Sequence, residues 1–235
     1  MRRLESHVTL SEAEKVVLGG ALGSRQRHKT SRASVADTHC PEGLTVILEG
    51  FAYRYKLLAV GRRQISGYFV AGDICSVRHS SLTRSDYCIG TLGPTETAIL
   101  SPGEILSEPQ RYPNLTRALW CSILAEQSIA REWISNVGPR TAYERVAHLF
   151  CELFVRLQWI GLTWEQRCNL PLTQRDLADA TSLSSVHVNR VLRQMRMDGL
   201  LTFHRGLLTI PDLTALRTAA GFDSTYLYLP QAARI

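Results

Sequence analysis

Several features that mark other classes of protein are missing from this 235-residue sequence. Its apolar runs stay well below the roughly 18 residues that a membrane-spanning helix requires, so no membrane span is predicted. The opening MRRL leads into Glu5 and His7 instead of an apolar segment, so no secretory signal is expected. These absences together predict a cytoplasmic protein.

The six cysteines lack the spacing of a zinc site or a redox pair, because no C-x-x-C motif occurs. We therefore expect no metal and no cofactor, and most thiols should be free and buried, as in other proteins of the reducing cytosol. His148 and Cys151, three residues apart in a helix-like segment, fit a packed helix face far better than a metal site. Cys75 and Cys88 fall in neighbouring strand-like segments, which keeps a thiol redox sensor open as an alternative. The scattered cysteines are Cys40, Cys75, Cys88, Cys121, Cys151 and Cys168.

Positive charge is in modest excess over negative charge. The net charge is +6 and the isoelectric point is near 9.2, which favours a polyanionic partner, although many basic proteins bind no nucleic acid. Hydrophobic residues make up 45% of the chain and charged residues 20%, which are ordinary values for a globular protein. The length allows one or two domains with an ample core.

The most informative segment spans residues 172–210, LTQRDLADATSLSSVHVNRVLRQMRMDGLLTFHRGLLTI. Thr173 precedes Asp176 by three residues at the start of an apolar pattern, which is typical of a capped helix N-terminus. This first helix breaks at Ser182, a position where such turns often carry glycine. Ser184 or Ser185 then begins a second helix that runs to about residue 197, where a glycine follows as a C-terminal signal.

The second helix has two contrasting faces. Val188, Val191, Leu192 and Met195 form a stripe with the spacing of a buried helix face. The opposite face can read bases, because arginine forks onto guanine, asparagine pairs with adenine and an apolar tip meets the thymine methyl group. Hydroxyl groups at the two helix N-termini suit phosphates. The candidate DNA-binding residues are Thr173, Ser184, Ser185, Val186, His187, Asn189, Arg190, Arg193 and Arg205.

A solvated helix face without a partner is the alternative interpretation of these polar residues. The following residues favour DNA binding, because LLTF and LLTI predict two short strands around the turn HRG. A helix-turn-helix followed by a basic-tipped hairpin is a winged helix, which places its second helix in the major groove of DNA.

The N-terminal part is patterned differently. Residues 10–22 predict a short helix capped by Ser11, and residues 25–100 are strand-like, with LTVILEGFAYRYKLL and RRQISGYFVAGD as the clearest strands. Several short strands at regular spacing suit a sandwich or barrel. A catalytic barrel would need clustered histidines and carboxylates, but this region holds only His28, His39 and His79, with no H-x-H motif. We therefore expect no enzymatic activity.

Two longer helices follow, at residues 115–137 and 142–160, with Gly138-Pro139 as a break and natural hinge between them. An apolar stripe on the first helix, interrupted by an acid, can pack on the β-rich part or on a second subunit. A symmetric dimer would double the contacts on a palindromic site. The candidate dimer-interface residues are Leu119, Ile123, Glu126, Ala130, Trp133 and Val137. The tail from Gly221 is expected to pack back on the core.

The segments ERVAHLFCEL, LPLTQRDLADA and SVHVNRVLRQMRMDGLL are similar to the superfamily of the cyclic-AMP receptor protein and the fumarate-nitrate regulator, the Crp/Fnr transcription regulators. The segment LEGFAYRYKLLAVGRRQISGYFVAGDI resembles its β-roll sensor. The resemblance implies an α+β fold with a β-roll (jelly-roll) sensor in residues 1–112, a dimerisation helix in 113–138 and a winged helix-turn-helix in 139–235. It also implies a homodimer on a palindromic operator in double-stranded DNA, with RNA polymerase as a further candidate partner.

The resemblance also bears on base choice. Members of the superfamily commonly read a base pair with an acid and an arginine one helical turn apart. Arg190 matches the arginine, but Val186 stands at the position of the acid. We therefore expect a half-site that differs at this base pair, with thymine favoured by the apolar Val186.

Nucleotide-binding members hold the cyclic phosphate with a Gly-Glu element after a Gly-Asp turn and an Arg-Ser about ten residues later. Here the Gly-Glu positions are Ser76 and Val77, the arginine position falls near Asp86 or Tyr87, and Arg84 would need a shifted loop. An acid at the arginine position would repel phosphate.

We therefore expect a sensor that does not bind cyclic AMP. The dimer-helix position that would meet the base lies near Arg131, where no hydroxyl pair is present. The signal is an unidentified small molecule or redox change, and an effector-independent or cysteine-redox-controlled regulator is the alternative. The candidate effector-pocket residues are Ser76, Val77, Asp86, Tyr87 and Arg131.

Overall fold

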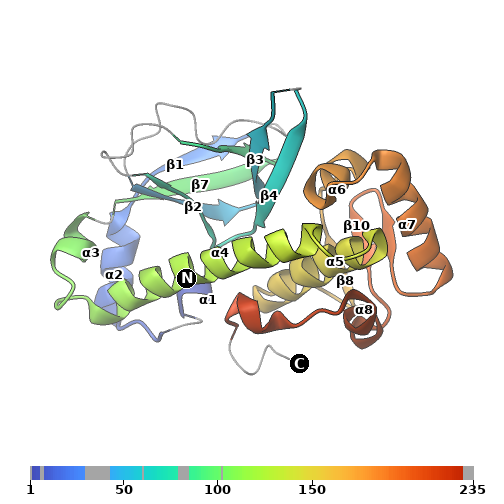
Figure 1. Ribbon diagram of the computed structural model, residues 1–235. Helices are drawn as coiled ribbons and strands as arrows, with labels where there is room; N and C mark the ends of the chain where they lie inside the picture. The colour runs from blue at the N-terminus through green and yellow to red at the C-terminus, as the bar shows by residue number, and fades with distance from the viewer. Residues whose placement is uncertain are drawn as a thin grey trace. The chain divides into compact units, whose positions relative to one another are not determined.

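The computed structural model describes residues 2–5, 8–29, 43–59, 61–78, 85–101 and 103–229. The chain forms two compact units, Met1–Lys56 with Tyr68–Gln127 and Leu57–Gly67 with Ser128–Ile235. Figure 1 shows the strands of the N-terminal part and the helices of the C-terminal part. Within the described residues, no helix combines the length and apolarity needed to cross a membrane.

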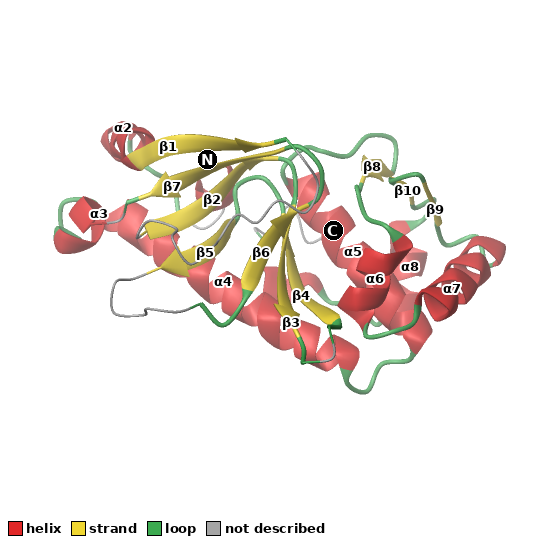
Figure 2. Ribbon diagram, turned by 90° about the horizontal axis from the view of Figure 1, so that it is seen from above, coloured by secondary structure: helices red, strands yellow, loops and turns green. Residues whose placement is uncertain are grey.

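The first unit is built mainly of strands. They form a four-stranded sheet in the order β1-β7-β2-β5 and a three-stranded sheet in the order β4-β3-β6, with antiparallel pairing wherever the register is defined (Figure 2). Strands β3 and β4 and helix α4 continue into the second unit. The elements are α1 (Arg2–Glu5), α2 (Glu12–Ala21), β1 (Leu22–His28), β2 (Gly43–Glu49), β3 (Ala52–Leu57), β4 (Arg63–Phe69), β5 (Ile74–Arg78), β6 (Cys88–Thr91), β7 (Thr95–Leu100), α3 (Gly103–Ser107) and α4 (Pro113–Val137).

Alternating apolar residues of these strands supply the core of the first unit. One buried cluster comprises Ile47, Ala52, Phe69, Cys75 and Ile89, with Tyr87 packed against it. Close approach is required at one position in β6, because a Cβ atom on Gly90 would lie 2.6 Å from the ring of Tyr53. A side chain at Gly90 would therefore displace a buried aromatic ring.

A buried carboxylate joins α2 to the start of α4. Glu14 completes a capping box with Ser11, and its Oε1 also accepts hydrogen bonds from the backbone N–H groups of Asn114 and Leu115 at 2.8 and 3.0 Å. Burial opposes ionisation, but the hydrogen bonds from Ser11, Leu115 and Asn114 lower the pKa of Glu14 to about 2. The carboxylate therefore satisfies the free N–H groups of two helix N-termini.

Helix α5 is the centre of the second unit, and α6, α7 and α8 pack against it. Its residues from Val146 to Leu157 are all buried, so the helix lies in an interior rather than on one surface. The elements are α5 (Ala142–Trp159), β8 (Arg167–Asn169), α6 (Gln174–Thr181), α7 (Ser185–Met197), β9 (Thr202–His204), β10 (Leu207–Thr209), α8 (Leu213–Ala220) and the 3₁₀ helix η1 (Ser224–Leu227).

Because α5 is buried all round, its charged side chains need internal partners. The carboxylate of Glu152 accepts hydrogen bonds from Arg156 at 3.0 Å, from the indole of Trp133 at 3.1 Å and from the hydroxyl of Tyr226 at 2.9 Å. Leu227 and Leu229 are buried as well, so the described part of the tail beyond Gly221 packs on the core as expected.

The predicted hinge at Gly138-Pro139 is braced by two arginines. Arg140 donates to Glu132 at 2.7 Å, and Arg145 donates to the carbonyl oxygens of Arg140 and Gly138 at 2.9 and 3.2 Å. Any change of angle between α4 and α5 would have to break or replace these hydrogen bonds.

Candidate nucleic-acid interface

Helix α6 begins as its sequence predicts. Thr173 is its N-cap, and the hydroxyl accepts from the backbone N–H of Asp176 at 3.2 Å while the Asp176 carboxylate accepts from the Thr173 N–H at 2.9 Å. Burial opposes ionisation of Asp176, but hydrogen bonds from Thr173 and the guanidinium of Arg63 lower its pKa below the ordinary value. Asp176 is therefore held as a buried carboxylate beneath the start of the helix-turn-helix.

The turn between α6 and α7 passes through a left-handed residue. Ser182, the C-cap of α6, has φ 56° and ψ 37°, a conformation that costs a non-glycine residue roughly 1–2 kcal/mol. The backbone of Ser182 therefore adopts the conformation that glycine provides in similar motifs, although the residue is a serine.

Helix α7 presents the two faces that its sequence predicts. Ser184 caps it by accepting from the N–H of His187 at 3.2 Å. Val188, Val191, Leu192 and Met195 are buried, and Val188 and Met195 are fully so. Opposite them, Val186 is 73% exposed, and Asn189, Arg190 and Arg193 are exposed as well. The hydrophobic stripe therefore anchors the helix and leaves its polar face accessible.

The hairpin that follows α7 is a small wing. Strands β9 and β10 pair antiparallel with His204 opposite Leu207, and β10 also pairs with β8. The two loop residues Arg205 and Gly206 have φ values of 48° and 79°, as a tight type I′ hairpin turn requires. Arg205 is exposed at this tip.

All the candidate DNA-binding residues are exposed and belong to one unit, on the caps of α6 and α7, on the outer face of α7 and at the wing tip. They are Thr173, Ser184, Ser185, Val186, His187, Asn189, Arg190, Arg193 and Arg205. An outward polar helix, hydroxyls at two helix N-termini and an arginine on the wing define a winged-helix DNA-binding protein.

The candidate effector residues do not share one environment. Ser76 is buried in β5, whereas the next residue Val77 is 49% exposed. Asp86 is exposed, Tyr87 is half-buried beside the β-core, and Arg131 is exposed on α4. Arg84 lies outside the described residues.

Sequence reasoning missed an ion pair beside Tyr87. Arg54 of β3 lies 3.1 Å from the carboxylate of Glu126 on α4, and its guanidinium lies over the rings of Phe69 and Tyr87 at 5.6 and 5.7 Å. The only signal in the sequence was Glu126, an acid that interrupts an apolar stripe. The pair is mostly buried, since both side chains are less than 20% exposed.

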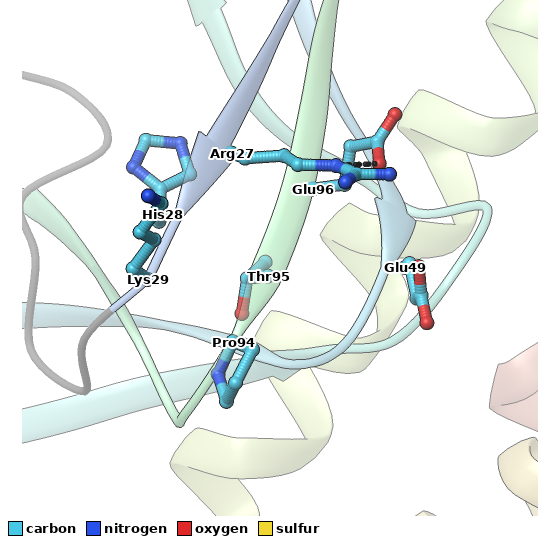
Figure 3. A pocket seen from close by; sticks show the side chains of 7 residues that line it. All are labelled: Arg27, His28, Lys29, Glu49, Pro94, Thr95 and Glu96. Atoms are coloured by element: carbon cyan, nitrogen blue, oxygen red, sulfur yellow. Dashed lines mark hydrogen bonds and ion pairs between the residues drawn. The ribbon is translucent and has the colours of Figure 1, made fainter.

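A surface pocket of about 260 Å³ lies elsewhere in the first unit (Figure 3). It is lined by Arg27, His28, Lys29, Glu49, Pro94, Thr95 and Glu96. Its charges are mixed, and Arg27 donates to Glu96 at 3.0 Å within it. The pocket contains none of the candidate effector residues.

The described cysteines differ in exposure. Cys75 and Cys88 lie in different sheets, and Cys75 is buried whereas Cys88 is half-buried. Burial raises the pKa of the Cys151 and Cys168 thiols to about 12, so these two are poor nucleophiles. Cys40 lies outside the described residues. In the described part of the chain, His, Cys, Asp and Glu residues form no group of three suited to a metal ion.

The candidate dimer-interface residues are buried or half-buried within their own chain. Leu119 belongs to a core cluster of the first unit, and Trp133 donates to Glu152. Ile123, Glu126, Ala130 and Val137 are half-buried. Six of the exposed residues of α4 instead follow a second stripe, at Arg117, Trp120, Leu124, Gln127, Arg131 and Ile134.

Comparison with known proteins agrees with this geometry. Residues 144–219 match the model of the Crp-like helix-turn-helix domain. The transcriptional activatory protein AadR of Rhodopseudomonas palustris is 23% identical over 86% of this chain and 81% of its own. The nitrogen fixation regulation protein FixK of Bradyrhizobium diazoefficiens is 25% identical over 81% of this chain and 79% of its own. The solved structure of FixK2 from Bradyrhizobium japonicum superposes with a TM-score of 0.71 at 22% identity, covering 83% of this chain and 96% of that one.

These findings confirm the α+β architecture and the winged helix-turn-helix predicted from the sequence. Residues 144–219 therefore form a Crp-like helix-turn-helix domain, and the chain is similar over most of its length to transcription regulators such as AadR and FixK.

Proposed function

We propose that this protein is a homodimeric, sequence-specific transcription regulator that binds a palindromic operator in cytoplasmic DNA. The observation that carries the proposal is the exposed outer face of α7, where Val186, Asn189 and Arg190 stand opposite a buried apolar stripe. Such a helix, flanked by capped N-termini and a basic wing, matches what the major groove of a DNA duplex requires.

Each exposed group has a distinct proposed role. Arg190 forks onto a guanine, Asn189 pairs with an adenine, and Val186 contacts a thymine methyl group. Thr173 and Ser184 lie at helix N-termini and, with Arg193 and Arg205, contact phosphates that set the register of the protein on the duplex. His187 flanks the base-reading face, and Ser185, the first residue of α7, is a further candidate for a phosphate contact.

We propose that the exposed stripe of α4 is the dimer interface. Its positions 117, 120, 124, 127, 131 and 134 alternate in steps of three and four, which is the heptad spacing of a coiled-coil seam. Trp120, Leu124 and Ile134 are 56%, 59% and 71% exposed, and burying them against a second copy removes large apolar side chains from water. A dimer would hold two recognition helices about 34 Å apart, one turn of the duplex.

The contacts within the first unit support a regulator that needs no cyclic nucleotide. The guanidinium of Arg54 lies over Tyr87, one of the candidate effector residues, and it is already paired with the carboxylate of Glu126 in the same chain. We therefore propose that the protein does not bind cyclic AMP, and titration calorimetry that detected micromolar binding would contradict this. Several relatives, AadR among them, are named as activators of transcription, so RNA polymerase is the further partner that we propose.

Selection from randomised duplex DNA tests the proposal. The wild-type protein should enrich a palindromic site. Arg190→Ala should weaken binding to that site by about 1–3 kcal/mol and relax base choice at one position. Arg193→Ala should instead weaken specific and random DNA alike and flatten the salt dependence, because a phosphate contact carries no sequence information. Equal losses of Arg190→Ala on specific and random DNA would refute its base-reading role.

A further inference from the structure

A segment far from the helix-turn-helix in sequence forms hydrogen bonds and ion pairs with its first helix. Leu57–Gly67, the loop between β3 and β4 with the start of β4, belongs to the same compact unit as α6. Its Arg63 donates through Nε to Asp179 at 2.8 Å and through Nη2 to Asp176 at 2.6 Å. One guanidinium therefore binds two carboxylates that stand three residues apart on α6.

The next residue of the segment reaches the other end of α6. The Ser182 hydroxyl donates to the Gln64 side-chain oxygen at 3.0 Å. Ser182 is the left-handed C-cap that sets the angle between α6 and α7. Arg63 and Gln64, which we name the clasp, thus hold α6 near its beginning and at its end.

The ion pairs of the clasp are shielded from water. The side chain of Arg63 is 12% exposed, and those of Asp176 and Asp179 are 2% and 19% exposed. A fork-shaped guanidinium with two carboxylate partners is a geometrically specific contact, unlike a mobile surface ion pair. Asp176 also closes the cap of α6 with Thr173, so the clasp fixes the N-terminus that is proposed to meet a phosphate.

The charge of the clasp suits DNA binding. Asp176 and Asp179 would repel a phosphate backbone close to α6, and Arg63 neutralises part of that charge. Arg63 and Gln64 contact α6 and its C-cap, while Val186, Asn189 and Arg190 on α7 stay exposed. The clasped arrangement therefore leaves the base-reading face free.

We infer that Arg63 and Gln64 are positioning residues for DNA recognition, which hold the helix-turn-helix in the orientation that reads the operator. This inference rests on the proposed function.

The test compares Arg63→Ala with Arg62→Ala in the full-length protein. Arg62 is the neighbouring, exposed arginine, so both variants lose one positive charge from the same segment. On the site selected by the wild-type protein, Arg63→Ala should lower affinity roughly tenfold, within the range typical of coupling between separate sites, and should lower affinity for random DNA far less. Arg62→Ala should weaken both DNAs equally and by less than threefold, as expected for a weak, non-specific electrostatic contribution.

A charge exchange separates positioning from folding. Arg63→Asp combined with Asp179→Arg should recover much of the specific affinity that Arg63→Asp alone loses. Gln64→Ala should reduce the ratio of specific to random affinity, while its melting temperature stays near that of the wild type. If Arg63→Ala unfolds, Arg63→Lys decides, because a lysine keeps the charge but not the fork. If either folded Arg63 variant binds the selected site within twofold of the wild-type affinity, the inference about the clasp is wrong but the proposed function stands. If the wild-type protein selects no site, both the proposed function and the inference are wrong.

Discussion

Val186 is the residue at which base choice should depart from that of Crp/Fnr regulators that carry an acid at the corresponding position. It is 73% exposed, one helical turn before Arg190, with only its methyl groups to offer a base pair. An apolar tip contacts the thymine methyl group, whereas a carboxylate at this point accepts from the amino group of cytosine.

Replacing Val186 by glutamate should therefore change the preferred base. Val186→Glu should disfavour thymine and enrich cytosine at the contacted position, with a discrimination of about 1–3 kcal/mol between the two. Parallel selections from randomised duplex DNA would measure this. Val186→Ala, which removes methyl groups without adding charge, is the matched control and should relax the preference only. Unchanged enrichment at that position with Val186→Glu would show that α7 sits on the duplex in another register.

Single residues also show where sequence reasoning succeeds and where it stops. The cap at Thr173, the turn at Ser182 and the exposure of Arg190 were predictable, because capping and helical periodicity are properties of neighbouring residues. The contact of Arg63 with Asp176 was not, since 113 residues separate them and the local signal at Asp176 indicates only the helix cap. For the pair Arg54–Glu126, the sequence indicated only one partner, Glu126, as an acid within an apolar stripe.

At the scale of elements, Glu14 couples the beginnings of α2 and α4 and gives this junction a defined pH dependence. Its pKa falls from 4.5 to about 2 in the folded chain, so folding favours the ionised form. The stabilisation is complete above the unfolded value of the pKa and is lost as the pH falls through the folded value.

Glu14→Gln should lower the free energy of unfolding by roughly 1–3 kcal/mol at neutral pH, because an amide accepts the backbone N–H groups less strongly than a carboxylate. The difference between wild type and variant should shrink as the pH is lowered from about 5 toward 2. Urea unfolding at a series of pH values measures both. Glu12→Gln, at an exposed residue of the same helix, should show little effect at any pH. A difference that stayed constant with pH would exclude Glu14 ionisation as its origin.

The 3₁₀ helix η1 is tied to the core through Tyr226, which donates to the buried carboxylate of Glu152 at 2.9 Å. Burial and the nearby Glu152 raise the pKa of Tyr226, so it remains a donor at neutral pH. Removing a hydrogen bond to a buried charge leaves part of that charge without compensation.

Tyr226→Phe should therefore lower the free energy of unfolding by roughly 1–3 kcal/mol with little change in shape. Chemical denaturation followed by circular dichroism would measure this. Tyr228→Phe is the matched control, since Tyr228 is 51% exposed two residues later and should change stability by less than about 0.5 kcal/mol. Equal stability of the Tyr226 variant and this control would show that the tail contributes nothing through its hydroxyl.

At the scale of the whole molecule, the question is which side of α4 meets a second copy. Apolar spacing predicts one stripe on this helix, and the structure exposes a second stripe beside it. Leu119 and Trp133 are buried in their own chain, whereas Trp120, Leu124 and Ile134 are not. The sequence could indicate a partner for α4 but could not assign its face, because both stripes satisfy the same helical period.

Leu124 lies in the middle of the exposed stripe, so Leu124→Glu should place two like charges across the seam of the proposed dimer and shift it to monomers. Each monomer keeps its winged helix, so binding to random DNA should persist while affinity for the palindrome falls, since one reader contacts only half of the site. Analytical ultracentrifugation and titration of the selected palindrome measure the two effects together. Val16→Glu, at a residue of α2 that is 74% exposed, adds the same charge outside the stripe and should leave both unchanged. A Leu124→Glu protein that sediments as a dimer would place the interface elsewhere, and a monomeric variant with undiminished affinity would show that the operator is read by one subunit at a time.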